Sequence, residues 1–159
     1  MIIYHGSNAV IMEPDVEHSF RALDFGKGFY TTTVKEQAER WAKRKASIYG
    51  QGKGIVSVYQ MLDEPQGLVY KDFGENLDEW IDFVCKCRDG GNEYLQYDLI
   101  TGKVANDKVF RVVDMYHSGI WEKERALKEI KIYPTYDQTA FITMKAIKQL
   151  VVYESFYEV

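Results

Sequence analysis

The stretch DFGKGFYTTTVKEQAERWAKR, residues 24–44, joins a glycine-rich turn to the start of a helix. Gly26 and Gly28 flank a lysine, and the next threonine able to cap a helix is Thr33. This spacing is too short for the G-x-x-x-x-G-K-[ST] phosphate loop, and Thr31 stands where G-x-G-x-x-G requires its last glycine. The glycines therefore predict a sharp turn between two core elements, not a phosphate cradle.

A helix is predicted directly after this turn. Thr33 and Glu36 have the T-x-x-E spacing of a capping box, in which each side chain satisfies a backbone N–H of the other. Apolar side chains then recur on one helical face, and Gly50 is a suitable end. Residues 29–31, between the glycines and the helix, are expected to form a short strand.

The rest of the chain predicts a single α+β domain over residues 1–159. Further strands are expected at residues 1–5, 54–62, 68–73, 139–143 and 151–159. Further helices are expected at residues 76–88, 104–117, 123–130 and 144–150, with 97–107 mostly a loop around Gly102. Strands and helices do not alternate as regular βαβ units, which favours α+β over a doubly wound sheet.

Composition narrows the function classes. The net charge of −4 disfavours a broad nucleic-acid-binding face, and the basic residues 43–45 are expected to be the solvated side of a helix. Aromatic residues make up 14% of the chain, which supplies flat surfaces for a planar ligand. No apolar run approaches the ~20 residues of a membrane span, and the first residues lack the pattern of a signal peptide. A cytoplasmic protein is expected.

Two cysteines, Cys85 and Cys87, lie two positions apart in a predicted helix. Side chains at this spacing do not face each other, so no disulfide is expected between them. No histidine lies nearby, so no metal site is expected either.

Five segments together resemble a known fold. They are YHGS at 4–7, DFGKGFYTT at 24–32, QAERWA at 37–42, YDLITGKVAND at 97–107 and QTAFIT at 138–143. The first two resemble the ADP-ribosyltransferase fold, and their local sequence is similar to that of the catalytic domain of poly(ADP-ribose) polymerases. All five in order resemble a bacterial family of small ADP-ribosyltransferase-like proteins, often toxins found beside a small antitoxin.

This resemblance implies an ADP-ribosyltransferase-like α+β fold: split mixed and antiparallel β-sheets with flanking helices and an NAD cleft between them. The implied activity is an NAD-dependent mono-ADP-ribosyltransferase that consumes NAD as its substrate and uses no metal. The acceptor of ADP-ribose, a protein or a nucleic acid, is not identified by the sequence. A small antitoxin protein is the implied partner, and no membrane is involved.

The resemblance also implies the catalytic residues. His5, Tyr30 and Gln138 match a triad of histidine, tyrosine and a late-strand glutamate or glutamine. His5 is expected to donate a hydrogen bond to the ribose next to nicotinamide, and Tyr30 to stack on the nicotinamide ring. Gln138 is expected to reach the ribose 2′-hydroxyl, and as a neutral amide it favours mono- over poly-transfer.

Further NAD contacts are implied at five positions. The backbone of Gly6 is expected to read the nicotinamide amide, and Trp41 to cover the second face of the ring. The other implied contacts are Ser7, Gly28 and Thr31. Ala38 stands where the polymerases have a serine that bonds the amide, so that contact is expected to be missing.

A base for the acceptor is not assigned by the sequence. Glu124, Glu129 and Asp137 are available, and they cannot be ranked. Asp24 and Asp98 are expected to position their loops rather than to act in catalysis.

The sequence is also compatible with two other functions. An NAD glycohydrolase would use water as acceptor and release free ADP-ribose. A non-catalytic module would bind NAD or ADP-ribose without releasing nicotinamide. The neutral Gln138 is compatible with this alternative. Each site residue taken alone is more often structural than functional; the functional interpretation rests on the five segments jointly.

Overall fold

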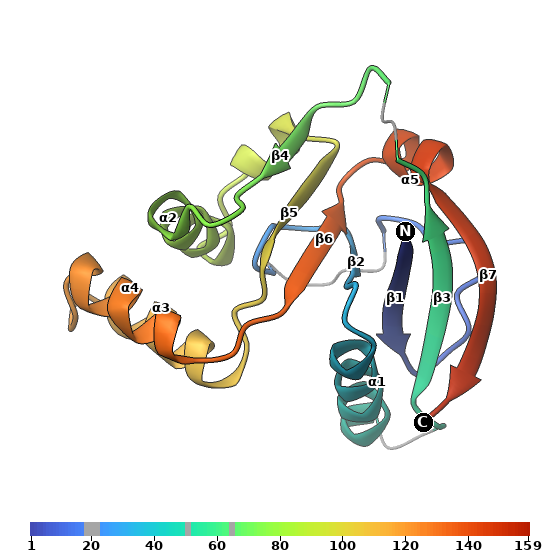
Figure 1. The fold of residues 1–159 in the computed structure, drawn as a ribbon, viewed down its shortest axis with the longest axis horizontal. Helices are drawn as coiled ribbons and strands as arrows, with labels where there is room; N and C mark the ends of the chain where they lie inside the picture. Colours follow the sequence, from blue (N-terminus) through green and yellow to red (C-terminus); the bar gives the residue numbers. More distant parts are fainter. Residues whose placement is uncertain (18–22, 50–51, 64–65) are drawn as a thin grey trace.

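The computed structural model describes residues 1–17, 23–49, 52–63 and 66–159, and they form a mixed α+β structure (Figure 1). In chain order the elements are β1 Ile2–Ser7, β2 Phe29–Thr31, α1 Lys35–Tyr49, β3 Ile55–Met61, β4 Tyr70–Asp72, α2 Leu77–Arg88, the 3-10 helix Glu93–Gln96, β5 Leu99–Lys103, α3 Asp107–His117, α4 Lys123–Ile132, β6 Asp137–Phe141, α5 Met144–Leu150 and β7 Val151–Glu158. The predicted α+β class is confirmed.

The strands form two sheets. One is antiparallel with the order β1-β3-β7, and the other is mixed with the order β2-β6-β5-β4, in which β4 and β5 run parallel. Tyr4 of β1 and Thr32, just after β2, link the sheets through two backbone hydrogen bonds of 2.8 and 2.9 Å. The two sheets therefore diverge from one short bridge, which we call the sheet junction (Figure 1).

The inner faces of the two sheets share one hydrophobic core. Side chains alternate between the faces of a strand, so Ile3 and Tyr59 of the three-stranded sheet point to the same side as Phe29, Leu99 and Phe141 of the other. Helix α5 completes this core with its own buried apolar side chains. The opposite, outer faces are left for the remaining helices.

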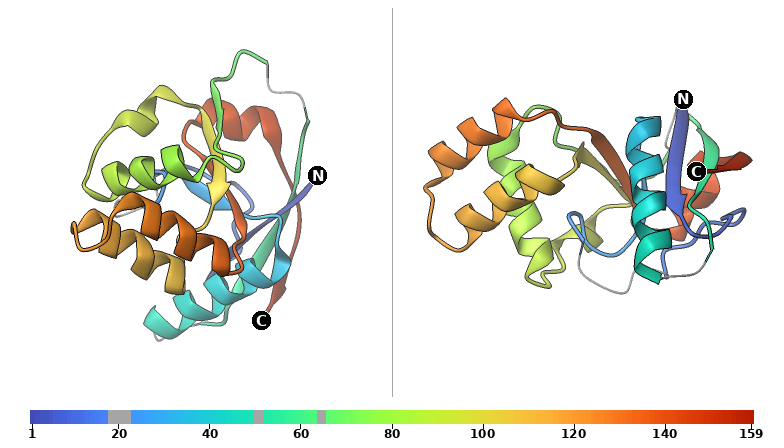
Figure 2. Two further views of the ribbon diagram at one scale, coloured as in Figure 1. Left: turned by 60° about the vertical axis from the view of Figure 1, so that its left-hand side comes forward. Right: turned by 90° about the horizontal axis from the view of Figure 1, so that it is seen from below.

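Helix α1 covers the outer face of the three-stranded sheet. Gly6 makes this approach possible: a Cβ there would lie 2.0 Å from the carbonyl oxygen of Ala38 and 2.8 Å from the nitrogen of Ala42. Ala38, Ala42 and Val56 are fully buried in the contact. Seen from below, α1 stands between the three-stranded sheet and helices α2, α3 and α4 (Figure 2).

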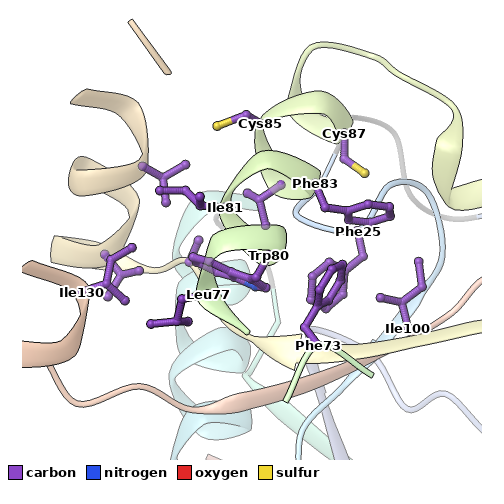
Figure 3. Packing of buried hydrophobic residues seen from close by; sticks show 14 of the residues in the cluster. Phe25, Phe73, Leu77, Trp80, Ile81, Phe83, Cys85, Cys87, Ile100 and Ile130 are labelled. Atoms are coloured by element: carbon purple, nitrogen blue, oxygen red, sulfur yellow. The ribbon is translucent and has the colours of Figure 1, made fainter. Parts of the chain in front are cut away.

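Helices α2, α3 and α4 cover the outer face of the four-stranded sheet. Phe25 of the glycine-rich turn inserts into this second core, beside Phe73 and Phe83 at ring-centroid distances of 5.7 and 6.2 Å. Figure 3 shows these rings next to Trp80 of α2. The turn before β2 is thus anchored by its own aromatic residue.

Two sequence predictions were wrong around residue 102. Leu99–Lys103 is a strand in the interior of its sheet, not a loop, and α3 begins at Asp107 rather than at residue 104. Gly102 is required for packing rather than for a turn, because a Cβ there would lie 2.8 Å from the Phe25 ring and 3.2 Å from that of Trp80. Strand β6 likewise begins at Asp137, two residues earlier than predicted, which places Gln138 inside it.

The predicted capping box is also absent at the start of α1, which begins at Lys35. The Thr33 hydroxyl and backbone N–H both bond the carboxylate of Asp137 instead, and Val34 N–H donates to the Thr32 hydroxyl. The Asp137 carboxylate, on β6, thus replaces Glu36 as the partner of Thr33. The predicted end of this helix, Gly50, lies outside the described residues.

Cys85 and Cys87 are both free on α2, as predicted, and both are buried. None of the helices in the described ranges is long and apolar enough to cross a membrane.

Candidate functional site

His5 fills the space where β1 and β2 diverge. Its ring nitrogen Nδ1 lies 2.6 Å from the backbone oxygen of Tyr30, and its ring stacks on Phe29 at 4.4 Å between centroids. The contact lies directly beyond the bridge between Tyr4 and Thr32. Two residues of the implied triad are therefore held together at the sheet junction.

This contact and the burial of the ring together determine the protonation state of His5. A carbonyl oxygen only accepts hydrogen bonds, so Nδ1 carries the proton. Burial, assisted by the positive charge of Lys45, lowers the pKa of His5 from 6.5 to about 4, so the ring is neutral at pH 7. The remaining nitrogen Nε2 then offers only a lone pair. In this neutral tautomer His5 has no second N–H with which to donate to a ribose hydroxyl, and its contact with a ribose stays a prediction.

Gly6 presents backbone groups to the same place. Tyr4 directs its N–H and its C=O to Thr32, and alternate residues of a strand direct these groups to the same edge. The N–H and C=O of Gly6 consequently point past the bridge, toward the space where the strands part. Helix α1 lies against Gly6, and the half-buried Trp41 follows Ala38 on that helix by three positions.

Tyr30 holds the glycine-rich turn in place. Its hydroxyl donates to Gly26 O at 2.6 Å and accepts from Phe25 N–H at 2.9 Å. Gly26 has a φ of 83°, a left-handed conformation that suits glycine, and Gly28 packs so closely that a Cβ would lie 2.7 Å from Phe141 O. Burial, followed by the charge of Asp24, raises the pKa of Tyr30 well above 10, so its hydroxyl remains protonated.

Gln138 is 3% exposed, and both N–H groups of its side-chain amide are hydrogen-bonded. Nε2 donates to a carboxylate oxygen of Asp24 at 3.0 Å and to Lys103 O at 3.1 Å. Both partners are acceptors, so the amide cannot be turned over without placing oxygen against oxygen. The group that Gln138 has left for a ligand is its carbonyl oxygen Oε1.

Asp24 is the centre of a partly buried polar network. Arg88 donates to its Oδ1 through Nη2 at 2.6 Å and through Nε at 3.2 Å, while Ala105 N–H donates to Oδ2 at 2.9 Å. Asp24 was predicted to orient the turn before Gly26, but these partners lie in distant segments of the chain. Arg88 and Ala105 were missed, since nothing in the sequence links them to residue 24.

A second buried amide, Gln37 on α1, was also missed. It is 2% exposed, and its Oε1 accepts from Arg40 at 2.8 Å and from the side chain of Asn106 at 3.1 Å. Asn106 immediately precedes α3, whose first residue Asp107 has a left-handed φ of 45°. Both Gln37 and Asn106 lie in segments of the family resemblance, which was the one available signal.

Two further residues, Thr31 and Ser7, were implied as NAD contacts. The hydroxyl of Thr31 points to the other face of β2 and donates to Thr139 O at 3.1 Å, so it is not beside Tyr30. Ser7 is buried at the end of β1.

The carboxylates considered as bases are dispersed. Asp137 is bonded to Thr33, and Glu124 is an exposed ion-pair partner of Lys128 on α4, the helix that also carries Glu129. Asp98, predicted to position its own loop, directly precedes β5 and accepts from Val69 N–H and from the Thr143 hydroxyl.

A surface hollow lies elsewhere, lined by Glu13, Pro14, Asp15, Met144, Ile147, Lys148 and Val151. It includes none of the triad residues. Among the described residues, no group of three or more histidine, cysteine or acidic side chains is arranged to hold a metal ion.

A family model described as "Protein of unknown function (DUF3990)" matches residues 1–152. The match covers nearly the whole chain, and the chain therefore belongs to this family. A search of curated proteins found no match.

Proposed function

We propose that this member of the DUF3990 family is an NAD-dependent mono-ADP-ribosyltransferase whose site lies at the sheet junction. One observation carries the proposal: His5 Nδ1 and Tyr30 O meet at 2.6 Å where β1 and β2 separate. Trp41 is on the helix packed against Gly6, the residue next to His5. This arrangement supports the ADP-ribosyltransferase-like fold that the five sequence segments imply.

The proposed roles follow from the groups that remain available. The carboxamide of nicotinamide has donors and an acceptor, which match the C=O and N–H of Gly6. Tyr30 and Trp41 supply the aromatic surfaces that flank the ring. His5 Nε2 accepts from one ribose hydroxyl, and Gln138 Oε1 accepts from another.

The reaction needs positioning more than covalent chemistry. When the bond between nicotinamide and ribose breaks, its electron pair moves onto the nicotinamide nitrogen, and nicotinamide leaves as a neutral molecule. The ribose carbon gains oxocarbenium-like positive charge, as in glycoside cleavage. Two oriented acceptors, His5 Nε2 and Gln138 Oε1, place negative dipole ends near that charge. The acceptor group then adds to the carbon and loses its proton.

An amide cannot take up that proton, so Gln138 does not act as the base. The acceptor itself or a carboxylate elsewhere must serve. This agrees with transfer of a single ADP-ribose unit.

The first test uses NAD labelled in its adenylate half, incubated with the purified protein and a bacterial lysate. Free nicotinamide and macromolecule-bound label are followed together. We expect both in the wild type, and loss of both in His5→Ala. His117→Ala is the matched control, because this histidine lies on α3 and bonds Asp89 at the surface.

Trp41 provides a second pair of variants. Trp41→Ala is expected to weaken NAD binding about fivefold, since one aromatic contact contributes about 1 kcal/mol, while Trp41→Phe retains most of it. Nicotinamide release without bound label would assign the chain as an NAD glycohydrolase.

A non-catalytic NAD- or ADP-ribose-binding module is the second candidate. It is favoured by one observation: the late-strand position carries an amide whose N–H groups are already bonded. NAD binding without any nicotinamide release in the test above would replace the enzyme proposal with this one.

The resemblance further implies a toxin restrained by a small antitoxin. We expect expression of the chain alone to arrest bacterial growth, and the His5→Ala variant to be tolerated. Growth that is equal for both proteins, at equal protein levels, would remove the toxin proposal.

A further inference from the structure

The Asp24 carboxylate collects four donated hydrogen bonds from three distant parts of the chain. Arg88 of α2 gives two to Oδ1, whereas Ala105 N–H and the Gln138 amide each give one to Oδ2. An ionised carboxylate has about four acceptor sites, so the network is saturated. An acid placed only to cap the glycine-rich turn would not need a partner on β6.

We propose that Asp24 is a positioning residue for Gln138: it fixes the amide so that Oε1, and not the amino group, faces the substrate ribose. This inference rests on the proposed function. Asp24 itself does not touch the substrate, because both of its oxygens are occupied.

The physical reason is the polarity of the surroundings. Gln138 Nε2 lies between two acceptors, Asp24 Oδ2 at 3.0 Å and Lys103 O at 3.1 Å. Turning the amide over would bring Oε1 against both oxygens and leave two donors without partners, at a cost of several hydrogen bonds. A free glutamine side chain has no such preference, so the orientation is a property of the network.

This orientation decides which substrate groups Gln138 recognises. Oε1 accepts from a ribose hydroxyl and presents the negative end of the amide dipole to the developing positive charge. The amino group, if it faced the ribose, would oppose that charge. Gln138 thus acts as a neutral counterpart of the glutamate in related triads. The negative charge lies instead on Asp24, which accepts a hydrogen bond from the Gln138 amide.

The test relocates that charge. Four proteins are compared: wild type, Asp24→Asn, Gln138→Glu and the double variant, which has the wild-type net charge. In Gln138→Glu a second carboxylate faces Asp24 Oδ2 and Lys103 O, so we expect a lower Tm. The double variant restores a donor–acceptor pair, with the amide now at position 24 and the carboxylate at position 138.

Two readouts are taken on each protein: Tm between pH 5 and pH 7, and the single-turnover rate of nicotinamide release with the Kd for NAD. Each single variant is expected to slow release about tenfold with a smaller change in Kd, the effect of one misdirected hydrogen bond. The double variant is expected to regain part of both losses, because the pair between positions 24 and 138 is restored while Ala105 N–H and Lys103 O lose their native partners. Between pH 7 and pH 5, Gln138→Glu alone should gain Tm relative to the wild type at the same pH, because the introduced carboxyl group, once protonated, can donate to Asp24.

Asp98→Asn is the matched control, since Asp98 also holds a loop through Val69 N–H and Thr143 but does not contact Gln138. We expect it to lower Tm and to leave the single-turnover rate unchanged. A Gln138→Glu protein as stable and as fast as wild type, or single variants whose Tm losses simply add in the double variant, would overturn the inference.

A wild-type protein that binds NAD but releases no nicotinamide would count against the enzyme proposal. The Tm coupling between positions 24 and 138 would still decide whether Asp24 positions Gln138.

Discussion

Asn106 donates from Nδ2 to Oε1 of Gln37 at 3.1 Å, and this hydrogen bond ties α1 to the start of α3. The two helices belong to different halves of the molecule: α1 packs on the three-stranded sheet, and α3 belongs to the helices on the four-stranded sheet. The bond spans these halves on the side of the sheet junction that carries Trp41. A ligand between α1 and the Asp24 network would meet this contact.

Gln37→Leu removes the acceptor while keeping the side-chain size. Asn106 and Arg40 lose a partner, so we expect a loss of about 1–3 kcal/mol in the free energy of unfolding and a faster association of NAD. Gln37→Glu is the matched control, because its carboxylate accepts from both partners. Urea unfolding and stopped-flow binding measure the two effects. Equal association rates for the two variants would show that the contact does not limit access.

His5 makes stability depend on pH. Its pKa is about 4 in the folded protein and 6.5 when exposed, so the unfolded state binds more protons between these values. The stabilisation is fully present above pH 6.5 and is lost as the pH falls toward 4, by at most about 3 kcal/mol. Urea unfolding of the wild type and of His5→Gln at pH 7 and pH 5 isolates the contribution of His5 to the pH dependence of the free energy of unfolding. An NMR titration of His5 with a midpoint near 6.5 would contradict it.

Gly6→Ala is expected to displace α1. The new methyl group would overlap Ala38 O, which belongs to the helix backbone and cannot rotate away. We expect a loss of about 2–4 kcal/mol, the upper range of overpacking, together with loss of NAD binding. Gly119→Ala serves as control: its surroundings are open and only its φ of 80° opposes the change, at about 1 kcal/mol. Thermal melts and NAD titrations of both proteins make the comparison.

The two cysteines are expected to be unreactive in the folded protein. Burial raises the pKa of Cys85 to about 11 and that of Cys87 to about 12, which leaves little thiolate at pH 7. Alkylation by iodoacetamide should be at least about a hundredfold slower than in urea, because the thiolate is the reacting species. A reductant should leave Tm unchanged. Rapid native alkylation would indicate that α2 opens readily.

Much of the fold could be predicted from periodic segments. Helix α2 and strand β3 lie within about one residue of their predicted bounds, because their apolar spacing coincides with the faces that they bury. Strand β5 could not be read from Gly102, which resembles turn chemistry but serves the rings of Phe25 and Trp80. Packing against residues far along the chain decided this element.

The sequence predicted candidate residues for the site, and that assignment stays a prediction, but it did not predict their hydrogen bonds. His5 and Tyr30 could be placed at one location from their segments, whereas the donor direction of His5 depends on the Tyr30 carbonyl that fills its Nδ1 position. The orientation of Gln138 depends likewise on Asp24 and Lys103, which local sequence does not connect to it. Protonation and amide direction are set by such tertiary partners.

The link between Asp24 and Gln138 spans 114 positions of sequence. During translation the HGS segment and the glycine-rich turn leave the ribosome early, yet Asp24 gains its partner on β6 only when nearly the whole chain has been made. The central strand of the three-stranded sheet acquires its second neighbour, β7, later still. A nascent or prematurely terminated chain that ends before residue 138 therefore lacks the contact between Asp24 and Gln138, and the site proposed above can form only after β6 has been made.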